Sequence, residues 1–264
     1  MRNDTVHLWL ADTRDMAPLV EVHYQSWLTD SEWQALAQKI PKVRLQVLWA
    51  KLFLKSILAR YVAKAPKALV FSHNAYGKPA LLETNLQFNL SHSEHFLALA
   101  VCHTVNVGVD VQVMRQRIEP LEIAERFFHQ QEYQWLQTLA PDKQNQGFYR
   151  LWSAKEAVLK AAGIGIGASG LKDVVWVAAE ASADSVLQMD FELSTALFHA
   201  FQWQEFFGLQ DCAFSLATVQ PVKHVQTFHW SIPVAPGSAN HCHLTTAESR
   251  IFHGERYSDN FVKI

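Results

Sequence analysis

The chain has 264 residues, 49% of them hydrophobic, and a formal net charge of −2 at pH 7. Such a chain can bury a substantial core, while its charge argues against a nucleic-acid binder, which would carry a net basic surface. No basic segment followed by an apolar run opens the sequence and no 18 consecutive apolar residues occur, so we expect a cytoplasmic protein without membrane association. Three scattered cysteines, Cys102, Cys212 and Cys242, indicate free thiols in a reducing compartment.

The first part of the chain is expected to contain a strand, two helices and further strands. Alternating polarity predicts a strand at 6–10, and the capping residues at 29–31 predict a short helix at 28–38. Pro41 suits the first turn of a long helix at 42–64, which is apolar on almost every side and should be central. An apolar segment at 69–72 and a turn at 74–79 come next. They are followed by strands at 88–90, 96–102 and 107–113.

The second part predicts helices followed by strands. The helices are expected at 122–128, 131–138 and 147–162, and the strands at 174–177, 189–193 and 213–219. The two parts are weakly alike, because each has a long helix, carrying Ala50-Lys51 or Ala154-Lys155, and a later strand, at 96–101 or 214–219. The tail from about 233 onward is expected to be a partly ordered extension.

Four short segments carry the chemistry. In chain order they are Gly77-Lys78-Pro79, Asn89-Leu90-Ser91-His92-Ser93, Gly108-Val109-Asp110-Val111-Gln112 and Trp152-Ser153-Ala154-Lys155-Glu156-Ala157-Val158-Leu159-Lys160. On a helix, Glu156 and Lys160 share a face, while Lys155 is rotated by about 100° from Glu156. On a strand, Asp110 and Gln112 share a face. Carboxylates beside ammonium groups suit a metal ion together with a phosphate.

These segments, in this order and with these gaps, resemble the signatures of the 4'-phosphopantetheinyl transferase superfamily, in its longer, surfactin-synthetase-activating branch. The resemblance covers about residues 1–220. It implies an α+β fold of two similar halves, 1–105 and 106–230, related by a pseudo-twofold axis with the active site between them. Residues 231–264 would form a C-terminal extension. A monomer is expected, because one chain would already carry both halves.

The resemblance also implies an activity and its residues. A transferase of the holo-[acyl-carrier-protein] synthase type moves 4'-phosphopantetheine from coenzyme A to a serine of an apo acyl or peptidyl carrier protein. The reaction depends on Mg²⁺ and releases 3',5'-ADP. The metal ligands would be Asp110, Gln112 and Glu156, and Glu156 and Lys160 would be catalytic. The coenzyme A contacts would be Arg44, Lys78, Ser91, His92, Lys155 and Lys160.

Gln112 departs from the commonest family pattern, in which this position is acidic. An amide supplies an oxygen ligand without charge, so the metal would be held more weakly, through water, or by two carboxylates only. The segment 115–117 and Arg126 offer a basic surface for an acidic carrier domain.

Two other functions stay open. A magnesium-dependent nucleotide hydrolase would use the same acids and lysines but pass the product to water. A non-catalytic binding module is favoured only by Gln112, and the presence of Asp110, Glu156, Lys155 and Lys160 speaks against it.

Overall fold

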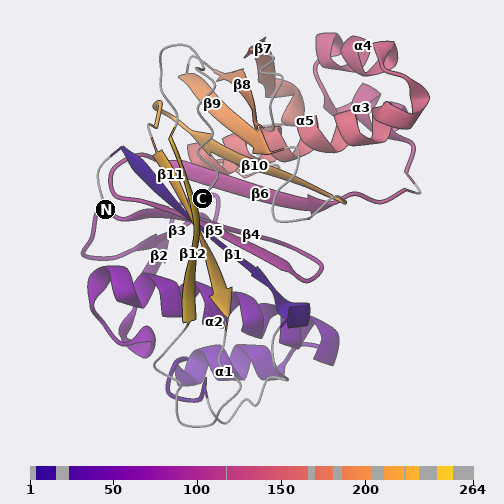
Figure 1. Ribbon diagram of the computed structural model, residues 1–264. Helices are drawn as coiled ribbons and strands as arrows, with labels where there is room; N and C mark the ends of the chain where they lie inside the picture. Colours follow the sequence, from indigo (N-terminus) through magenta and orange to yellow (C-terminus); the bar gives the residue numbers. More distant parts are fainter. Residues whose placement is uncertain are drawn as a thin grey trace.

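Two five-stranded sheets pack between two long helices (Figure 1). The computed structural model describes residues 4–15, 24–116, 118–165, 170–180, 186–194, 196–203, 211–222, 224–231 and 243–251. The first sheet has the order β12 (His243–Ile251), β11 (His224–Ser231), β1 (Thr5–Asp12), β5 (Phe96–Cys102) and β4 (Gln87–Ser93). The second has the order β6 (Val107–Val113), β10 (Cys212–Thr218), β9 (Ala196–Trp203), β8 (Val186–Leu193) and β7 (Val174–Glu180). The expected mixed α+β content is confirmed.

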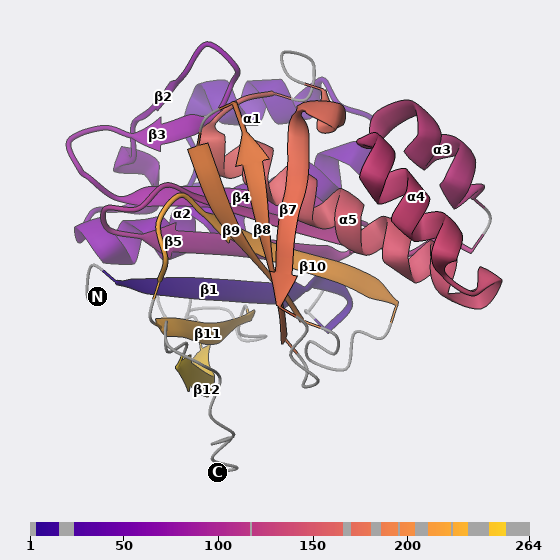
Figure 2. The same ribbon diagram turned by 90° about the horizontal axis from the view of Figure 1, so that it is seen from above.

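The helices are α1 (Asp30–Ala37), α2 (Pro41–Val62), α3 (Pro120–Phe127), α4 (Gln130–Thr138) and α5 (Pro141–Ala162). A two-stranded sheet joins β2 (Phe71–His73) to β3 (Pro79–Leu81), and 3-10 turns within the described ranges include Thr13–Asp15, Pro66–Ala68 and Leu171–Asp173. Helices α3 and α4 lie next to each other beside α5 (Figure 2). Within the described ranges, no helix is long and apolar enough to cross a membrane.

Strand periodicity builds the layers. In β1, Val6, Leu8 and Leu10 belong to the core between the two sheets, while Trp9 and Ala11 face α2. Strand β5 is buried along its whole length because it divides its side chains between the same two cores. A third core lies between the second sheet and α5. Full burial of each large apolar side chain stabilises the fold by about 1.5–3 kcal/mol, so the four layers, helix, sheet, sheet and helix, hold together mainly through these three cores.

The pair α1–α2 and the pair α4–α5 are built alike. Helices α2 and α5 are both 22 residues long, both begin with a proline, and both end at a residue in the left-handed conformation, Ala63 or Gly163. The preceding helices α1 and α4 are each opened by a capping box, with Glu32 or Glu132 at the third helical position. Matching elements therefore stand about 100 residues apart.

Each of these glutamates also receives a lysine from the long helix. Lys55 donates to Glu32 at 2.7 Å, and Lys155 donates to Glu132. The two pairs occupy equivalent positions, because Lys55 and Lys155 are the fifteenth residues of their helices. The likeness between the two parts of the sequence had instead paired Lys51 with Lys155. The structure corrects that alignment by four residues, one helical turn.

Among the described elements, five strands were not anticipated from the sequence. They are β2, which overlaps the expected apolar segment at 69–72, β3, which begins where a turn was expected to end, and β9, β11 and β12. Strand β11 pairs in parallel with β1, so a segment near the end of the chain completes the sheet that its first residues begin. Strand β12 lies in the region expected to be a partly ordered tail and pairs antiparallel with β11. Cys102 and Cys212 are buried free thiols, as expected, and Cys242 lies outside the described residues.

Candidate active site

The edges of the two sheets meet where β4 runs beside β6. Alternate side chains of β4 accept hydrogen bonds from alternate backbone N–H groups of β6: Val109 to Asn89 Oδ1 at 2.8 Å, Val111 to Ser91 Oγ at 3.3 Å, and Val113 to Ser93 Oγ at 3.0 Å. An unpaired edge strand would leave these donors without partners. The Asn-Leu-Ser-His-Ser segment therefore has a structural role, since its polar side chains hold the second sheet against the first.

While the edge of β6 meets β4, one face of β6 lies against α5. Gly108 touches the backbone of α5 so closely that a side chain would not fit there. Because strand residues alternate, Asp110 and Gln112 point to the same side as Gly108. This close approach brings Asp110 to the last turns of α5, where Glu156 and Lys160 lie on the face that i and i+4 residues share.

Asp110 is the centre of a buried polar cluster. Its Oδ1 accepts from Ser91 Oγ at 3.0 Å and from Lys160 Nζ at 2.5 Å. Lys160 Nζ also donates to Ser91 Oγ at 3.1 Å and lies 3.6 Å from Glu156 Oε2. On the other side of that carboxylate, the Trp152 indole N–H donates to Glu156 Oε1 at 2.6 Å. The cluster thus joins side chains from β4, β6 and α5.

The electrostatics of the two acids differ from those of a surface pair. Burial raises the pKa of Glu156 above its usual range, and the neighbouring Asp110 raises it further, while Lys160 and the Trp152 hydrogen bond act in the opposite direction. Two carboxylates pressed together in this way favour either a shared proton or a cation between them.

The donor set suits a divalent cation held by two carboxylates. Asp110 Oδ2 is buried and has no hydrogen-bond partner, which leaves one oxygen beside Glu156 for an oxygen-seeking metal such as Mg²⁺. Gln112 is half-buried on the same face of β6 and would be the further oxygen donor. Among the residues that the structure describes, no three His, Cys, Asp or Glu side chains gather as a metal site, so Asp110 and Glu156 would carry the charge of such a site.

Lys78 joins the two parts of the chain at the end of α5. Its Nζ donates to the carbonyls of Val107 at 3.2 Å and Ala161 at 3.1 Å, and burial lowers its pKa to about 8. The turn before it is closed by Asn74, whose side chain donates to Gly163 O at 2.7 Å. The Gly-Lys-Pro turn therefore covers the C-terminal end of the helix that carries Glu156.

Two other expected coenzyme contacts lie outside the Asp110 cluster. His92 is on the opposite face of β4 from Ser91, and its side chain reaches solvent. The part of the ring that is covered by protein and the Lys160 charge lower the pKa of His92, while the Asp110 charge raises it less strongly. Arg44 is half-buried in the first turn of α2, as the sequence predicts.

Lys155 differs from its expected role. Its side chain is 0% exposed and is paired with Glu132, which is also fully buried. The other oxygen of Glu132 accepts the Trp176 backbone N–H at 2.9 Å. Because the helical rotation turns Lys155 away from Glu156 and into α4, the expectation that Lys155 contacts a substrate phosphate finds no support in this geometry.

Some neighbours of the cluster were given no role by the sequence. Trp152 belongs to the quoted motif, and its spacing of four from Glu156 was the available signal for their contact. Below Asp110, Ser215 Oγ accepts from Gln202 Nε2 and from Ser153 Oγ, each at 3.0 Å, and Ser153 Oγ lies 3.3 Å from the Asp110 carbonyl oxygen. These residues come from four elements, β6, α5, β9 and β10, so no local pattern in the sequence predicts their contact.

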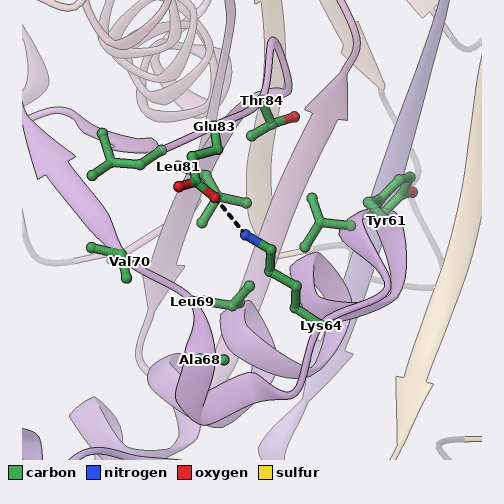
Figure 3. A pocket seen from close by; sticks show the side chains of 10 residues that line it. Tyr61, Lys64, Ala68, Leu69, Val70, Leu81, Glu83 and Thr84 are labelled. Carbon is green, nitrogen blue, oxygen red and sulfur yellow. Dashed lines mark hydrogen bonds and ion pairs between the residues drawn. The ribbon is translucent and has the colours of Figure 1, made fainter.

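A separate cavity of about 410 Å³ opens at the C-terminal end of α2. Its walls come from the last turn of α2, the segment 68–70 and the turn after β3, and the Lys64–Glu83 ion pair crosses it at 2.8 Å (Figure 3). None of the sequence-predicted site residues lines this cavity. The cluster around Asp110 is therefore the better candidate for the active site.

Comparisons with known proteins point to one family. The model of the 4'-phosphopantetheinyl transferase superfamily matches residues 106–226. A putative 4'-phosphopantetheinyl transferase of Synechocystis sp. is 36% identical over 173 residues, which cover 64% of this chain and 68% of that protein. The 4'-phosphopantetheinyl transferase HetI of Nostoc sp. is 32% identical over 62% of this chain and 71% of its own length. The 4'-phosphopantetheinyl transferase Sfp of Bacillus subtilis is 32% identical over 46% and 53%, respectively.

Proposed function

The chain belongs to the 4'-phosphopantetheinyl transferase superfamily, and we propose that it transfers 4'-phosphopantetheine from coenzyme A to a serine of an apo acyl or peptidyl carrier protein, releasing 3',5'-ADP. The observation that carries this proposal is the cluster of Ser91, Asp110, Glu156 and Lys160, which three separate motif segments assemble at one place. The relatives are named only as 4'-phosphopantetheinyl transferases, so we propose this broader activity and not the narrower holo-[acyl-carrier-protein] synthase type.

In this reaction the serine oxygen attacks the phosphorus that bears the pantetheine arm, and the bond to 3',5'-ADP breaks. Glu156 takes the serine proton, because burial and Asp110 raise its pKa toward the range in which a carboxylate is an effective base at neutral pH. The Trp152 indole N–H holds Oε1, while Oε2 faces the Lys160 ammonium at 3.6 Å. Lys160 screens the negative charge that develops on the departing phosphate.

Mg²⁺ held by Asp110 and Glu156, with Gln112 as a neutral third donor, would neutralise charge on the pyrophosphate oxygens. We assign coenzyme A binding to Arg44, Lys78, Ser91, His92 and Lys160, because the basic side chains among them can pair with phosphate and Ser91 already contacts Lys160. Lys78 would have to exchange its two carbonyl partners for a phosphate. Lys155 is not included, since its ammonium is buried with Glu132.

The acceptor would dock beside this site. Arg115 and Arg126 are exposed, and the Arg126 guanidinium lies over the ring of Phe127, which is itself exposed. Such a surface offers both positive charge and apolar contact to an acidic carrier domain. Arg117, also expected here, lies outside the described residues.

We also propose that the two halves are related by a pseudo-twofold axis. Besides the matched helices and ion pairs, β1 pairs with β5 and β5 with β4, as β6 pairs with β10 and β10 with β9. The halves would be 1–105 and 106–230, with 231–264 as an extension, although β11 and β12 extend the sheet of the first half. Because both halves lie in one chain, a monomer suffices for activity.

The repeat offers a reason for a single active site. The residue that stands 100 positions before Glu156 is Ser56, whose Oγ accepts the Trp230 indole N–H at 2.9 Å. Trp230 belongs to β11, the strand that adds to β1. The first half therefore lacks the acid at this position and fills the place with an aromatic side chain.

The test is to measure 3',5'-ADP release from coenzyme A and Mg²⁺ with an apo carrier, with the same carrier lacking its acceptor serine, and without carrier. The proposal predicts release only with the intact apo carrier. Release at the same rate in all three reactions would show a nucleotide hydrolase instead.

A further inference from the structure

The Trp152 indole, which holds Glu156, is itself enclosed by three phenylalanine rings. Their centroids lie 6.3 Å (Phe127), 6.2 Å (Phe128) and 5.6 Å (Phe148) from the Trp152 ring. Phe128 and Phe148 also stack on each other at 5.3 Å. An aromatic ring confined on several sides has few orientations, so the direction of the indole N–H depends on where these rings are held.

Phe128 is fixed in turn by the buried ion pair. The Lys155 ammonium lies 4.8 Å from the centre of the Phe128 ring, within the range of a cation–π contact. Glu132 holds that ammonium and also accepts the His129 backbone N–H, one residue beyond Phe128, at 3.0 Å. A continuous set of contacts therefore runs from Glu132 through Lys155, Phe128 and Trp152 to the carboxylate of Glu156.

The first half supplies an internal comparison. It keeps the same ion pair, Lys55 with Glu32, but has Leu52 and Ser56 where the second half has Trp152 and Glu156. The ion pair occurs in both halves, so it belongs to the way each pair of helices is built. Only in the second half does it connect to an acid of the candidate active site.

We propose that the Glu132–Lys155 pair positions Glu156 through Phe128 and Trp152, and that Lys155 is a positioning residue with no contact to substrate. The proposal deepens the proposed function, because it assigns a role at the same site. It distinguishes Lys155 from Lys160, which lies five residues later and contacts Asp110 directly.

The direct test follows the Trp152 indole N–H by NMR in protein labelled with ¹⁵N-tryptophan, and needs no substrate. Trp152→Phe identifies the resonance by its loss. Lys155→Met is expected to shift it and speed its exchange with solvent, whereas the matched control Lys55→Met leaves it in place. Both variants lose an ion pair to a buried or half-buried carboxylate, but Glu32 keeps Lys51 as a partner at 3.1 Å, so the free energy of unfolding of each variant is measured beside its spectrum.

Phe128→Leu provides a second variant that keeps the ion pair and removes the ring, in case Lys155→Met does not fold. It is expected to shift the same resonance. An unchanged Trp152 resonance in Phe128→Leu, or in folded Lys155→Met, would overturn the proposal, as would an equal shift in Lys55→Met.

A kinetic test rests on the proposed function. Misplacing a catalytic group by about 1 Å can cost about a hundredfold in rate, so Lys155→Met is expected to lower kcat by about tenfold or more with KM for coenzyme A within about twofold. A large rise in KM with unchanged kcat would show a phosphate contact and overturn the positioning role. If the parent protein modifies no carrier, the proposed function fails, and the NMR comparison still decides this inference.

Discussion

Gly108→Ala is the substitution for which the structure gives the sharpest expectation. A methyl group at this position would lie 2.0 Å from the carbonyl oxygen of Ala157 and 2.4 Å from the backbone nitrogen of Ala161, where ordinary contact begins at 3.4 Å. Both atoms belong to the backbone of α5, so no side-chain rotation relieves the overlap. The helix and β6 must therefore move apart by more than 1 Å.

That separation has two consequences. Overpacking in a core usually costs about 1–3 kcal/mol, and a clash between two backbones belongs at the upper end, so we expect a loss of about 3 kcal/mol in the free energy of unfolding. The same movement withdraws Glu156 and Lys160 from Asp110. A displacement of about 1 Å at reacting groups can lower the rate by about a hundredfold, which we expect in the variant that remains folded.

The assay combines denaturant unfolding with initial rates of carrier modification. Gly170→Ala is the matched control, because its added methyl group would meet its nearest atoms at 3.8 and 3.9 Å, and it should leave both quantities unchanged. Stability within about 0.5 kcal/mol of the parent, the range of ordinary surface substitutions, together with an unchanged rate for Gly108→Ala would refute the argument from close approach.

Three further predictions follow from single side chains. Glu156→Gln keeps the shape but loses the base, so turnover should be abolished with an unchanged circular dichroism spectrum, and a rate within a few-fold of the parent would exclude Glu156 as the base. Gln112→Glu adds a charge beside the carboxylates and should lower the Mg²⁺ concentration for half-maximal rate, by tenfold if Mg²⁺ binding gains about 1.4 kcal/mol. Identical midpoints in Mg²⁺ titrations of parent and variant at fixed ionic strength would mean that Gln112 points away from the metal. Burial lowers the pKa of His7 from 6.5 to about 4, so the unfolded chain binds the proton first and stability should rise with pH across this window. His7→Gln should flatten that rise in urea unfolding, and an unchanged slope would contradict the assignment.

The sequence anticipated those features that depend on local pattern. The long helix α2 follows from Pro41 and from the apolar residues after it, and the buried strand β5 follows from its uninterrupted apolar run, whereas α5 begins at Pro141, six residues before its predicted start. The grouping of Asp110, Glu156 and Lys160 in one family pattern agrees with their proximity in the structure. A motif records which residues occur together, and here these residues share a cluster.

Features that depend on distant pairing could not be anticipated in this way. Strand β11 pairs with β1, which lies more than 200 residues earlier in the chain. The sequence of β11 itself mixes polar and apolar residues and gives no clear strand pattern. The burial of Lys155 against Glu132 was not anticipated, because Glu132 lies on another helix and is locally a capping residue. Spacing on a helix gives the direction of a side chain, but the element that it meets is decided by tertiary packing.

Modification of a carrier protein by this chain would be seen as an increase in the intact mass of the carrier. A panel of apo acyl and peptidyl carrier domains is incubated with the protein, coenzyme A and Mg²⁺, with Glu156→Gln as the inactive control. We expect at least one carrier to gain the mass of one phosphopantetheine group with the parent protein, and no carrier to gain it with the control or without Mg²⁺. No gain on any carrier, from folded protein shown to bind coenzyme A, would contradict this expectation.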